Sequence, residues 1–562
     1  MFGFRQKRNA AGPPQAQPAV AEAVDATGAF PRGLPDENRM KPAATARWFS
    51  AEEIAAEKLL PAWQPGMLLL GRDHHGRYYG HADDRHVLTV AGSRAGKGVS
   101  LIVPNLLFWP GSVIAIDPKG ELATITASRR HKDGSDWAKP IEGEGEVYAL
   151  DPFNRVTGEA KRFAEACFNP MDGLDPNSDE GADLAYQLAD ALIVQAQGEG
   201  VFWTQSARGY LRALILHVAA TEPPDSCHLV RVRQLIMLSE KDRETLFHEM
   251  KVSDDPIVSG MGSAMLGRTK GEAGSILSSC EAQTTFLDGG PMRRVLCGRS
   301  SFRLEDLKAK RITVYLCLPA MRLETHGRWL RLFVQMAVDA MERTGPLQKG
   351  KPAVLFVLDE FAALGRMTSI EKAAGQIASF GAKLWPIVQD LTQLQRDYKE
   401  AWETFMGNAG CLTFFGNTDV TTTNHIMQRL GSTEIVSAVI NGQDSWGSST
   451  QPGSEHPLAL IFGQANGSRP QTNTQGGGSR SFSQQVTVAP LMHGSEVTLS
   501  FARETGKLLV LVPDKPPLAL FRCIYHDQKD GALFGGLYDQ APGQDAPHTD
   551  RAQREKIDEG RA

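Results

Sequence analysis

Residues 88–98 read LTVAGSRAGKG, a short apolar run that leads into a glycine-punctuated loop with Lys97 near its end. This arrangement is typical of a phosphate-binding loop, in which consecutive backbone N–H groups and the start of the next helix surround a phosphate while the lysine contacts the β- and γ-oxygens. The stretch therefore predicts nucleotide binding, and the residues expected to bind are Gly92, Ser93, Arg94, Ala95, Gly96, Lys97, Gly98 and Val99.

Two positions depart from the usual pattern G-x-x-x-x-G-K-[ST]. Ala91 stands at the first glycine, and Gly98 replaces the hydroxyl residue that normally helps to hold Mg²⁺. Ser100, two residues further on, would lie at a different angle of the following helix and is a poor substitute. An ordinary strand-to-helix turn is the alternative interpretation, so the rest of the chain has to decide between them.

Residues 353–360, AVLFVLDE, form a continuous apolar run of the buried-strand type that ends in Asp359 and Glu360. Acidic residues at the carboxyl end of a parallel strand lie where α/β proteins bind ligands. In phosphoryl transfer one such carboxylate commonly holds Mg²⁺, and a neighbouring acid can orient the attacking water. We therefore predict Asp359 as the metal-binding residue and Glu360 as a catalytic residue.

Two further apolar runs end in polar residues. The run at residues 111–121, GSVIAIDPKGE, ends in Asp117, Lys119 and Glu121, and the run at residues 382–390, AKLWPIVQD, ends in Gln389. Gln389 is predicted to contact the γ-phosphate or the attacking water. Four polar strand ends on one sheet favour a nucleotide site over a chance turn.

The distance between Lys97 and Asp359, 359 − 97 = 262 residues, is too long for adjacent elements of a minimal nucleotide fold. From about residue 183 to 290 apolar residues recur at helical spacing, as in LAYQLADALIVQA. We therefore predict an all-α insert at 183–290 within a nucleotide-binding domain at 61–182, 291–440 and 486–540. VTLSF (497–501) and residues 508–523 are expected to add strands. The remaining predicted segments are a flexible one at 1–60, a polar mobile loop at 441–485 and a disordered tail at 541–562.

Trp203, Arg208 and Tyr210 lie within the predicted insert. Interleaved aromatic and basic residues suit contact with single-stranded DNA, whereas their helical spacing favours core and flank positions. The net charge of −5 gives no overall attraction to nucleic acid, so any DNA contact must be local. Seven scattered cysteines without a C-x-x-C pair indicate neither a zinc site nor a disulfide framework.

No stretch of about 20 apolar residues, the length that a membrane helix needs, occurs in the chain. The apolar core of a secretory signal is missing as well. We therefore expect a cytoplasmic protein without a transmembrane segment, recruited to the inner membrane through partners.

In their order, these segments resemble the type IV coupling proteins, the hexameric conjugative DNA-transfer ATPases of type IV secretion systems. The segments that carry the resemblance are AGSRAGKGVSLIVPNLLFWPGSVIAIDPKGE, FWTQSARGYLRALILHV, VLFVLDEFAALGRM, FGAKLWPIVQDLTQL and GNAGCLTFFGNTDVTTTNHIMQRLG. The resemblance implies an α/β fold, a RecA-like P-loop nucleotide-binding domain with an inserted all-α subdomain. The N-terminus departs from the family, because coupling proteins usually begin with transmembrane helices.

The resemblance also implies a mechanism. ATP would bind between subunits of a homohexamer, with residues 92–98 on its phosphates, Asp359 on Mg²⁺, Glu360 activating water and Gln389 at the γ-phosphate. A cation from the neighbouring subunit would be Arg366 or Lys383, although Arg366 could equally be an exposed loop charge. Hydrolysis would move single-stranded DNA, with an attached relaxase or another protein substrate, into the type IV secretion channel.

Two other functions compete with this one. The first is a related DNA translocase outside secretion. The second is a receptor for protein substrates that binds nucleotide with little turnover, an alternative that Ala91 and Gly98 leave open.

Overall fold

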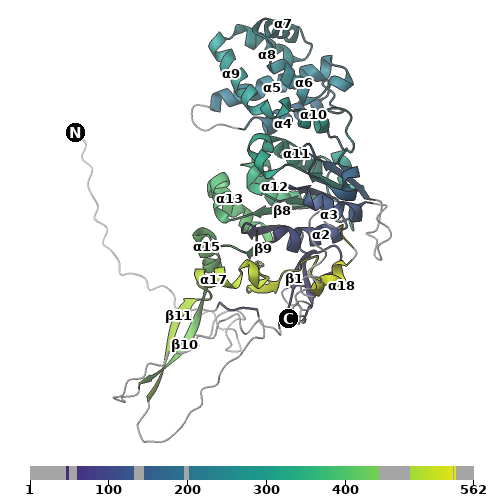
Figure 1. The fold of residues 1–562 in the computed structure, drawn as a ribbon. Helices are drawn as coiled ribbons and strands as arrows, with labels where there is room; N and C mark the ends of the chain where they lie inside the picture. The colour runs from purple at the N-terminus through teal and green to yellow at the C-terminus, as the bar shows by residue number, and fades with distance from the viewer. Residues whose placement is uncertain are drawn as a thin grey trace, which may run out of the picture.

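The computed structural model of this protein describes residues 46–49, 53, 60–131, 145–194, 201–441, 481–535 and 537–539. Within these residues, the centre of the molecule is an 11-stranded mixed sheet with the strand order β2-β1-β13-β12-β9-β3-β8-β7-β4-β6-β5. A group of helices forms a lobe beyond one end of this sheet-containing body, and a two-stranded hairpin extends from the other end (Figure 1).

The strands from β9 to β5 run parallel to one another. They are β3 (His86–Ala91), β4 (Val113–Ile116), β5 (Gly145–Leu150), β6 (Arg311–Leu316), β7 (Val354–Leu358), β8 (Ala382–Val388) and β9 (Ala409–Phe415). The strands predicted from apolar runs, β3, β4, β7 and β8, are all among them. Because these strands point the same way, their carboxyl ends lie along one edge of the sheet.

Alternate side chains of the parallel strands enter two different cores. Ile114 and Ile116 of β4 pack on one face of the sheet, whereas Val113 and Ala115 pack on the other. A strand buried on both faces reads as a continuous apolar run, which is why the sequence shows no alternation here. The helices that cover the faces include α2 (Val103–Phe108) and α3 (Glu121–Arg130) in one core and α11 (Leu323–Arg343) in the other.

An antiparallel extension continues the sheet beyond β9. It is formed by β1 (Leu68–Arg72), β2 (Tyr78–His81), β12 (Lys507–Leu511) and β13 (Leu518–Phe521). The prediction that residues 508–523 add strands is therefore confirmed. The final described helix, α18 (Gly531–Phe534), follows this extension.

The prediction of a strand at residues 497–501 is wrong. These residues belong to α17 (Gly494–Ser500) and to Phe501, which directly follows it. A capping box between His493 and Glu496 starts the helix, which buries Val497 and Phe501 and leaves Leu499 exposed. The alternation V-T-L-S-F suggested a strand, but the two buried residues are four positions apart, which is the spacing of a helix face.

The remaining helices of the sheet-containing body follow β7, β8 and β9. They are α12 (Thr368–Gln376), α13 (Leu391–Tyr398), α14 (Trp402–Gly407) and α15 (Val420–Leu430). Asp390 and Asp419 cap α13 and α15 by accepting a backbone N–H with their side chains. Each cap fixes the point at which the chain turns from a strand end into a helix.

The helical lobe lies between β5 and β6 in the sequence. It consists of α4 (Asp179–Leu192), α5 (Val201–Thr221), α6 (Leu229–Ile236), α7 (Glu240–Lys251), α8 (Pro256–Gly267), α9 (Lys270–Thr284) and α10 (Gly290–Leu296). These helices lie above α11 in Figure 1, and α4 packs directly against α11. The helical stretch extends a few residues beyond both of the predicted limits, 183 and 290.

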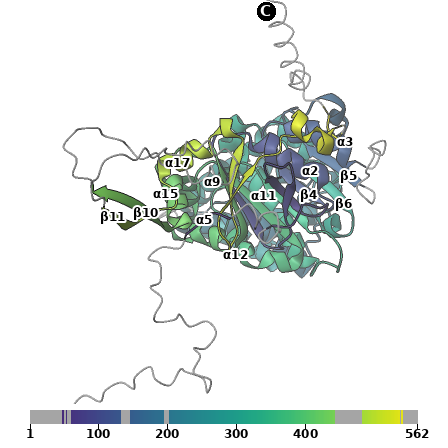
Figure 2. The same ribbon diagram turned by 90° about the horizontal axis from the view of Figure 1, so that it is seen from below.

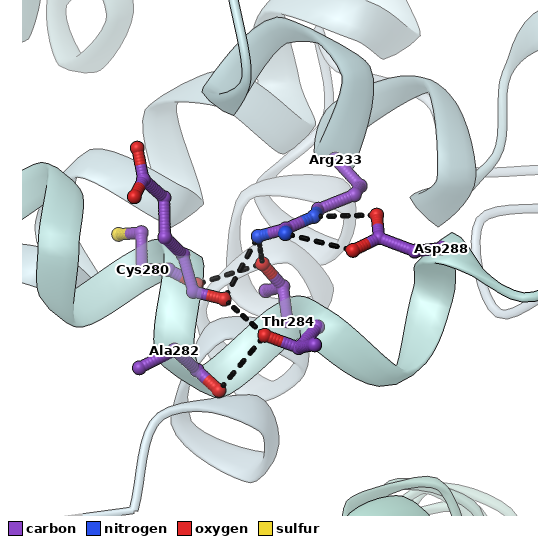
Figure 3. Close-up of polar contacts among 7 residues, drawn as sticks. Arg233, Cys280, Ala282, Thr284 and Asp288 are labelled. Atoms are coloured by element: carbon purple, nitrogen blue, oxygen red, sulfur yellow. Dashed lines mark hydrogen bonds and ion pairs between the residues drawn. The ribbon is translucent and has the colours of Figure 1, made fainter.

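A buried arginine joins three helical segments of the lobe (Figure 3). Arg233 of α6 forms a bidentate ion pair with Asp288, at 2.8 and 2.9 Å. It also donates hydrogen bonds to the carbonyl oxygen of Glu281 and to the hydroxyl of Thr284. All three guanidinium nitrogens therefore donate within the lobe itself, which suits a structural role.

The aromatic and basic residues of α5 occupy core and flank positions. Tyr210 is fully buried, and Trp203 packs partly buried against the core. Arg208 forms an ion pair with Asp190 of α4 at 2.9 Å and donates to the carbonyl oxygen of Ile193. These contacts agree with the helical-spacing interpretation rather than with a stacking surface for DNA.

The hairpin consists of β10 (Ser432–Asn441) and β11 (Ser481–Pro490), which extend away from the helices in both views (Figure 1 and Figure 2). Strand β11 thus includes residues 481–485 of the predicted polar loop, while residues 442–480 lie outside the described residues. The predicted tail at 541–562 and nearly all of the predicted segment at 1–60 lie outside them as well. Across the part of the chain that the structure describes, no helix has the length and apolar character to cross a membrane.

Candidate functional site

The glycine-punctuated loop joins β3 to a turn of π-helix, Gly98–Ile102, which continues into α2. Gly96 has a φ of 93°, and Lys97 directly after it is right-handed, with φ −52° and ψ −45°. Successive residues of opposite hand turn their N–H groups towards one side and form a concavity that suits an anion. The loop geometry therefore agrees with the phosphate-binding prediction.

The structure explains why alanine is accepted at position 91. Ala91 is the last residue of β3 and is fully buried. The close contact between the loop and the chain that follows β9 occurs one residue later, at Gly92. A Cβ on Gly92 would overlap the carbonyl oxygen of Gly416, which follows β9. The glycine that this loop needs is therefore Gly92. At Gly98, by contrast, an added Cβ would meet no atom of the described chain within 4 Å.

Three of the predicted residues meet beside this loop. Lys97 Nζ lies 2.8 Å from Asp359 Oδ1 and 2.8 Å from Glu360 Oε1, two residues that follow β7 on the other side of β8. Burial opposes the charge of Lys97, but the two carboxylates outweigh burial and raise its pKa. Burial also raises the pKa of Asp359, and Lys97 counteracts this rise.

Gln389, at the end of β8, is the fourth member of the cluster. Its Nε2 donates a hydrogen bond of 3.0 Å to Glu360 Oε2. Glu360 has a left-handed backbone, with a φ of 57°, a conformation that is uncommon outside glycine and often found at functional sites. Its two carboxylate oxygens are thus held by Lys97 and Gln389.

The DPKGE segment does not bring its charged residues into this cluster. Asp117 is buried and accepts the backbone N–H of Ala123, so that it holds the start of α3. Burial raises the pKa of Asp117 to about 7. Lys119 and Glu121 are exposed and 3.7 Å apart. The segment therefore builds a strand-to-helix turn along the same edge of the sheet.

The two candidates for a cation supplied to a neighbouring subunit differ in exposure. Arg366 has a half-exposed side chain 3.3 Å from Glu371 and does not reach the Lys97 cluster of its own chain. Lys383 is buried and donates to the carbonyl oxygens of Asp83 and Arg85. Burial lowers its pKa to about 8. Lys383 thus has no free surface to offer, and its prediction is wrong.

Two residues that contact this site were not predicted from the sequence. Asn417 follows β9 and donates to the backbone carbonyl of Gln389 at 3.3 Å. Arg522 follows β13 and donates to the carbonyl oxygen of Ala95 within the loop. Asn417 carried a weak local signal, because it follows a glycine at a strand end. Arg522 lies at the end of a predicted strand with no motif around it.

A cavity of about 540 Å³ lies at the other edge of the sheet. Glu146 and Ile312, near the amino ends of β5 and β6, line it together with Arg299 and Arg303. The cavity is separate from the Lys97 cluster, which lies at the carboxyl ends of the parallel strands.

Comparison with known proteins identifies the family. The family described as Type IV secretory system Conjugative DNA transfer matches residues 40–545. Protein VirD4 of Agrobacterium fabrum (strain C58 / ATCC 33970) is 29% identical over 370 residues, covering 63% of this chain and 51% of that protein. Conjugal transfer protein TraG of Escherichia coli is 28% identical over 430 residues, covering 70% of this chain and 64% of that one. The chain thus spans about half the length of the VirD4 relatives.

Solved structures show the same fold. The plasmid coupling protein TrwB, in complexes with the ATP analogue ADPNP and with ADP and Mg²⁺, matches with a TM-score of 0.56 in both cases. The identity is 13%, and the match covers 88% of this chain and 96% of TrwB. The RecA-like P-loop fold that the sequence predicted is therefore confirmed. Because the family match extends over most of its residues, this chain belongs to the type IV secretory system conjugative DNA transfer family.

Proposed function

We propose that this protein is an ATP-hydrolysing coupling protein that moves single-stranded DNA, with its attached relaxase or other protein substrates, into a type IV secretion channel. One observation carries the enzymatic part of the proposal. Lys97, Glu360 and Gln389 form a continuous chain of hydrogen bonds beside the glycine loop, with Asp359 on the same lysine. They come from three adjacent parallel strands or the turns that follow them.

The loop and Lys97 would bind the phosphates of ATP. The concavity at Gly96 and Lys97 offers backbone N–H groups to a phosphate. The ammonium of Lys97 could contact phosphate oxygens that take the place of the two carboxylates. TrwB, which shares this fold, has been solved with ADPNP and with ADP and Mg²⁺. Adenine nucleotide is therefore the ligand that we assign to this loop.

The residues present also fit a Mg²⁺ ion. Asp359 is a buried carboxylate whose pKa is raised by burial, so a cation beside it stabilises its charged form. Hard oxygen donors of this kind are the ligands that Mg²⁺ prefers. When bound, Mg²⁺ supplies neutralisation of charge on the phosphate oxygens. Gly98 offers no hydroxyl, so Asp359 is the side chain that we assign to the metal.

Glu360 is placed to handle the proton of the attacking water. Once phosphate draws Lys97 away, Glu360 Oε1 is free to accept that proton, while Gln389 keeps hold of Oε2. The amide of Gln389 fixes the carboxylate orientation, and its position at the end of the neighbouring strand β8 lets it sense the γ-phosphate. Glu360 would thus accept the proton, and Gln389 would orient the Glu360 carboxylate.

The partners follow from the family and from its ring architecture. We assign this chain to a homohexamer with ATP bound between subunits, and Arg366 is the candidate for the cation supplied to the neighbouring site, because its side chain is half exposed. Components of the secretion channel would recruit the protein to the inner membrane from the cytoplasm. Relaxase or other protein substrates would arrive with the single-stranded DNA.

The experiment that tests this proposal is steady-state ATP hydrolysis with and without single-stranded DNA, for the wild type and for Glu360→Gln. General-base removal costs about 10²- to 10⁴-fold in rate, so we expect DNA-stimulated turnover that the substitution abolishes. Glu121→Gln is the matched control, because Glu121 is an exposed carboxylate at the same edge of the sheet. It should retain full turnover.

Two outcomes would redirect the proposal. Nucleotide binding without turnover, in the presence and absence of DNA, would favour a receptor for protein substrates over a motor. Stimulation by duplex DNA but not by single strands would favour a DNA translocase outside secretion.

A further inference from the structure

Arg522 is a buried arginine that reaches the glycine loop from a distant part of the sequence. Its side chain is 6% exposed, and its backbone N–H is fixed by the carbonyl oxygen of Gly506 at 2.7 Å. One guanidinium nitrogen, Nη1, donates to the carbonyl oxygen of Ala95, and Nη2 donates to that of Arg503. The guanidinium carbon lies 4.9 Å from the centre of the Phe415 ring, at the end of β9.

This guanidinium forms no direct ion pair with a described carboxylate, although the charge of Glu504 acts on it and raises its pKa. None of the ion pairs found among the described residues includes Arg522, and its Nε has no hydrogen-bond partner in that part of the chain. Burial lowers the pKa of Arg522 to about 10, which still leaves it charged at neutral pH. Arg233 in the helical lobe, by contrast, has Asp288 as its counter-ion.

The contact with Ala95 fixes the orientation of one peptide unit of the loop. The carbonyl of Ala95 and the N–H of Gly96 belong to the same trans peptide, and they point in opposite directions. Because Arg522 holds the carbonyl, the Gly96 N–H points away from Arg522. No described residue accepts a hydrogen bond from this N–H.

The same peptide unit is free to rotate when nothing holds it. Gly96 has a φ of 93°, and glycine adopts positive and negative φ about equally well. A rotated peptide would turn the Ala95 carbonyl oxygen towards the phosphate side of the loop. An oxygen there would repel the phosphates that the N–H is meant to bind.

We propose that Arg522 is a positioning residue that locks the Ala95–Gly96 peptide with its N–H towards the nucleotide phosphates and adds a positive charge behind the loop. The inference rests on the proposed nucleotide binding. It makes the strand pair β12–β13 part of the phosphate site, although no residue of these strands carries a recognisable motif.

The test is equilibrium binding of ADP with Mg²⁺ to the full chain, measured by calorimetry for the wild type, Arg522→Ala and Arg503→Gln. Loss of a hydrogen bond from a charged group corresponds to about tenfold or more in affinity, so Arg522→Ala should bind ADP at least about tenfold more weakly. Arg503→Gln is the matched control. It removes a nearby exposed charge, and the loop does not depend on its side chain.

Rescue separates positioning from general damage. Arg522→Ala leaves a space the size of a guanidinium group, so guanidinium chloride at low millimolar concentration should restore much of its ADP affinity without affecting Arg503→Gln. If Arg522→Ala does not fold, Arg522→Lys replaces it. An ammonium can pair only one of the two carbonyls well, so we expect affinity about threefold below that of the wild type.

The outcomes distinguish this inference from the proposed function. Wild-type protein that binds no ADP would overturn both. Wild-type protein that binds ADP, together with a folded Arg522 variant that binds it equally well, would overturn the positioning role alone. Weaker binding by Arg522→Ala that guanidinium ion cannot restore would show a structural role and would also overturn it.

Discussion

The helical lobe and the Lys97 cluster both hold charged side chains that are at least partly removed from solvent, and the two regions pair these charges differently. In the lobe, Arg233 meets one carboxylate with two parallel hydrogen bonds, and its other nitrogen is taken by a carbonyl and a hydroxyl. At the cluster, Lys97 is shared by two carboxylates, and one of them is also held by Gln389. The lobe has formed a closed network, whereas the cluster consists of partners that a phosphate can replace. A charged side chain with a structural role pairs with groups that stay in place, whereas one that binds a ligand has partners that the ligand can replace.

Replacing Lys97 should have the largest effect on the functional side of this comparison. Lys97→Met removes the cation that we propose faces the phosphates, and it leaves the partly buried Asp359 without its counter-ion. We expect ATP hydrolysis to fall by about two to three orders of magnitude, the usual cost of removing one preorganised electrostatic contact. Lys119→Met, an exposed lysine at the end of β4, should keep wild-type turnover in the same assay.

Replacing Arg233 should affect stability instead of chemistry. Arg233→Met leaves the half-exposed Asp288 and the Glu281 carbonyl without their donor, which should lower the free energy of unfolding of the lobe by about 1–2 kcal/mol. Urea denaturation followed by circular dichroism measures this loss. Affinity for ADP at low temperature should stay unchanged. A drop in ADP affinity comparable to that of Lys97→Met would contradict the separation of the two regions.

Two glycines of the loop, Gly92 and Gly98, should respond differently to substitution by alanine. Gly92→Ala forces the loop away from the carbonyl of Gly416, so we expect a loss of about 1–3 kcal/mol in stability together with weaker ADP binding. Gly98→Ala meets open space and should change the free energy of unfolding by less than about 0.5 kcal/mol. Thermal unfolding of both variants, with and without ADP, tests the pair. Equal effects would show that the close approach to Gly416 is not what restricts the loop.

Asp117 should give an effect on stability that depends on pH. Burial raises its pKa to about 7 in the folded protein, above the ordinary value near 3.8. At pH values below the pKa of Asp117 in the unfolded chain, the raised pKa makes its full contribution to the free energy of unfolding. This contribution is lost as the pH rises through 7. Asp117→Asn should therefore flatten the decline of stability between pH 5 and 8. Urea midpoints at these two pH values test it, and an unchanged slope would contradict the expectation.

Much of the parallel sheet could be predicted from sequence, because a strand buried on both faces is an unbroken apolar run. The polar residues that end β3, β7 and β8 could be placed together for the same reason, since parallel strands share one edge. The contact between Arg522 and Ala95 spans 427 residues and has no local pattern. Residues 497–501 were wrongly predicted as a strand because their apolar residues alternate. The capping box that starts α17, which would have indicated a helix, lies just upstream of them.

The assignment of Lys383 failed for a related reason. The sequence makes Lys383 a candidate for a cation supplied to a neighbouring subunit, because it does not show which backbone carbonyl oxygens the lysine meets. The structure puts the ammonium against the backbone of Asp83 and Arg85, two carbonyl oxygens that belong to a turn before β3. Backbone acceptors leave no trace in residue identity, so roles that depend on them require coordinates.

The shared pairing of Lys97 has a consequence for affinity. In the ligand-free protein Asp359 and Glu360 act as an internal competitor for the lysine, so nucleotide enters by displacing anions that the chain itself supplies. Binding and turnover then respond oppositely to Glu360. Glu360→Gln weakens the competitor and should bind ADP more tightly than the wild type while hydrolysing ATP far more slowly. Under the proposed function, this lower affinity at rest would let the product leave after each turnover.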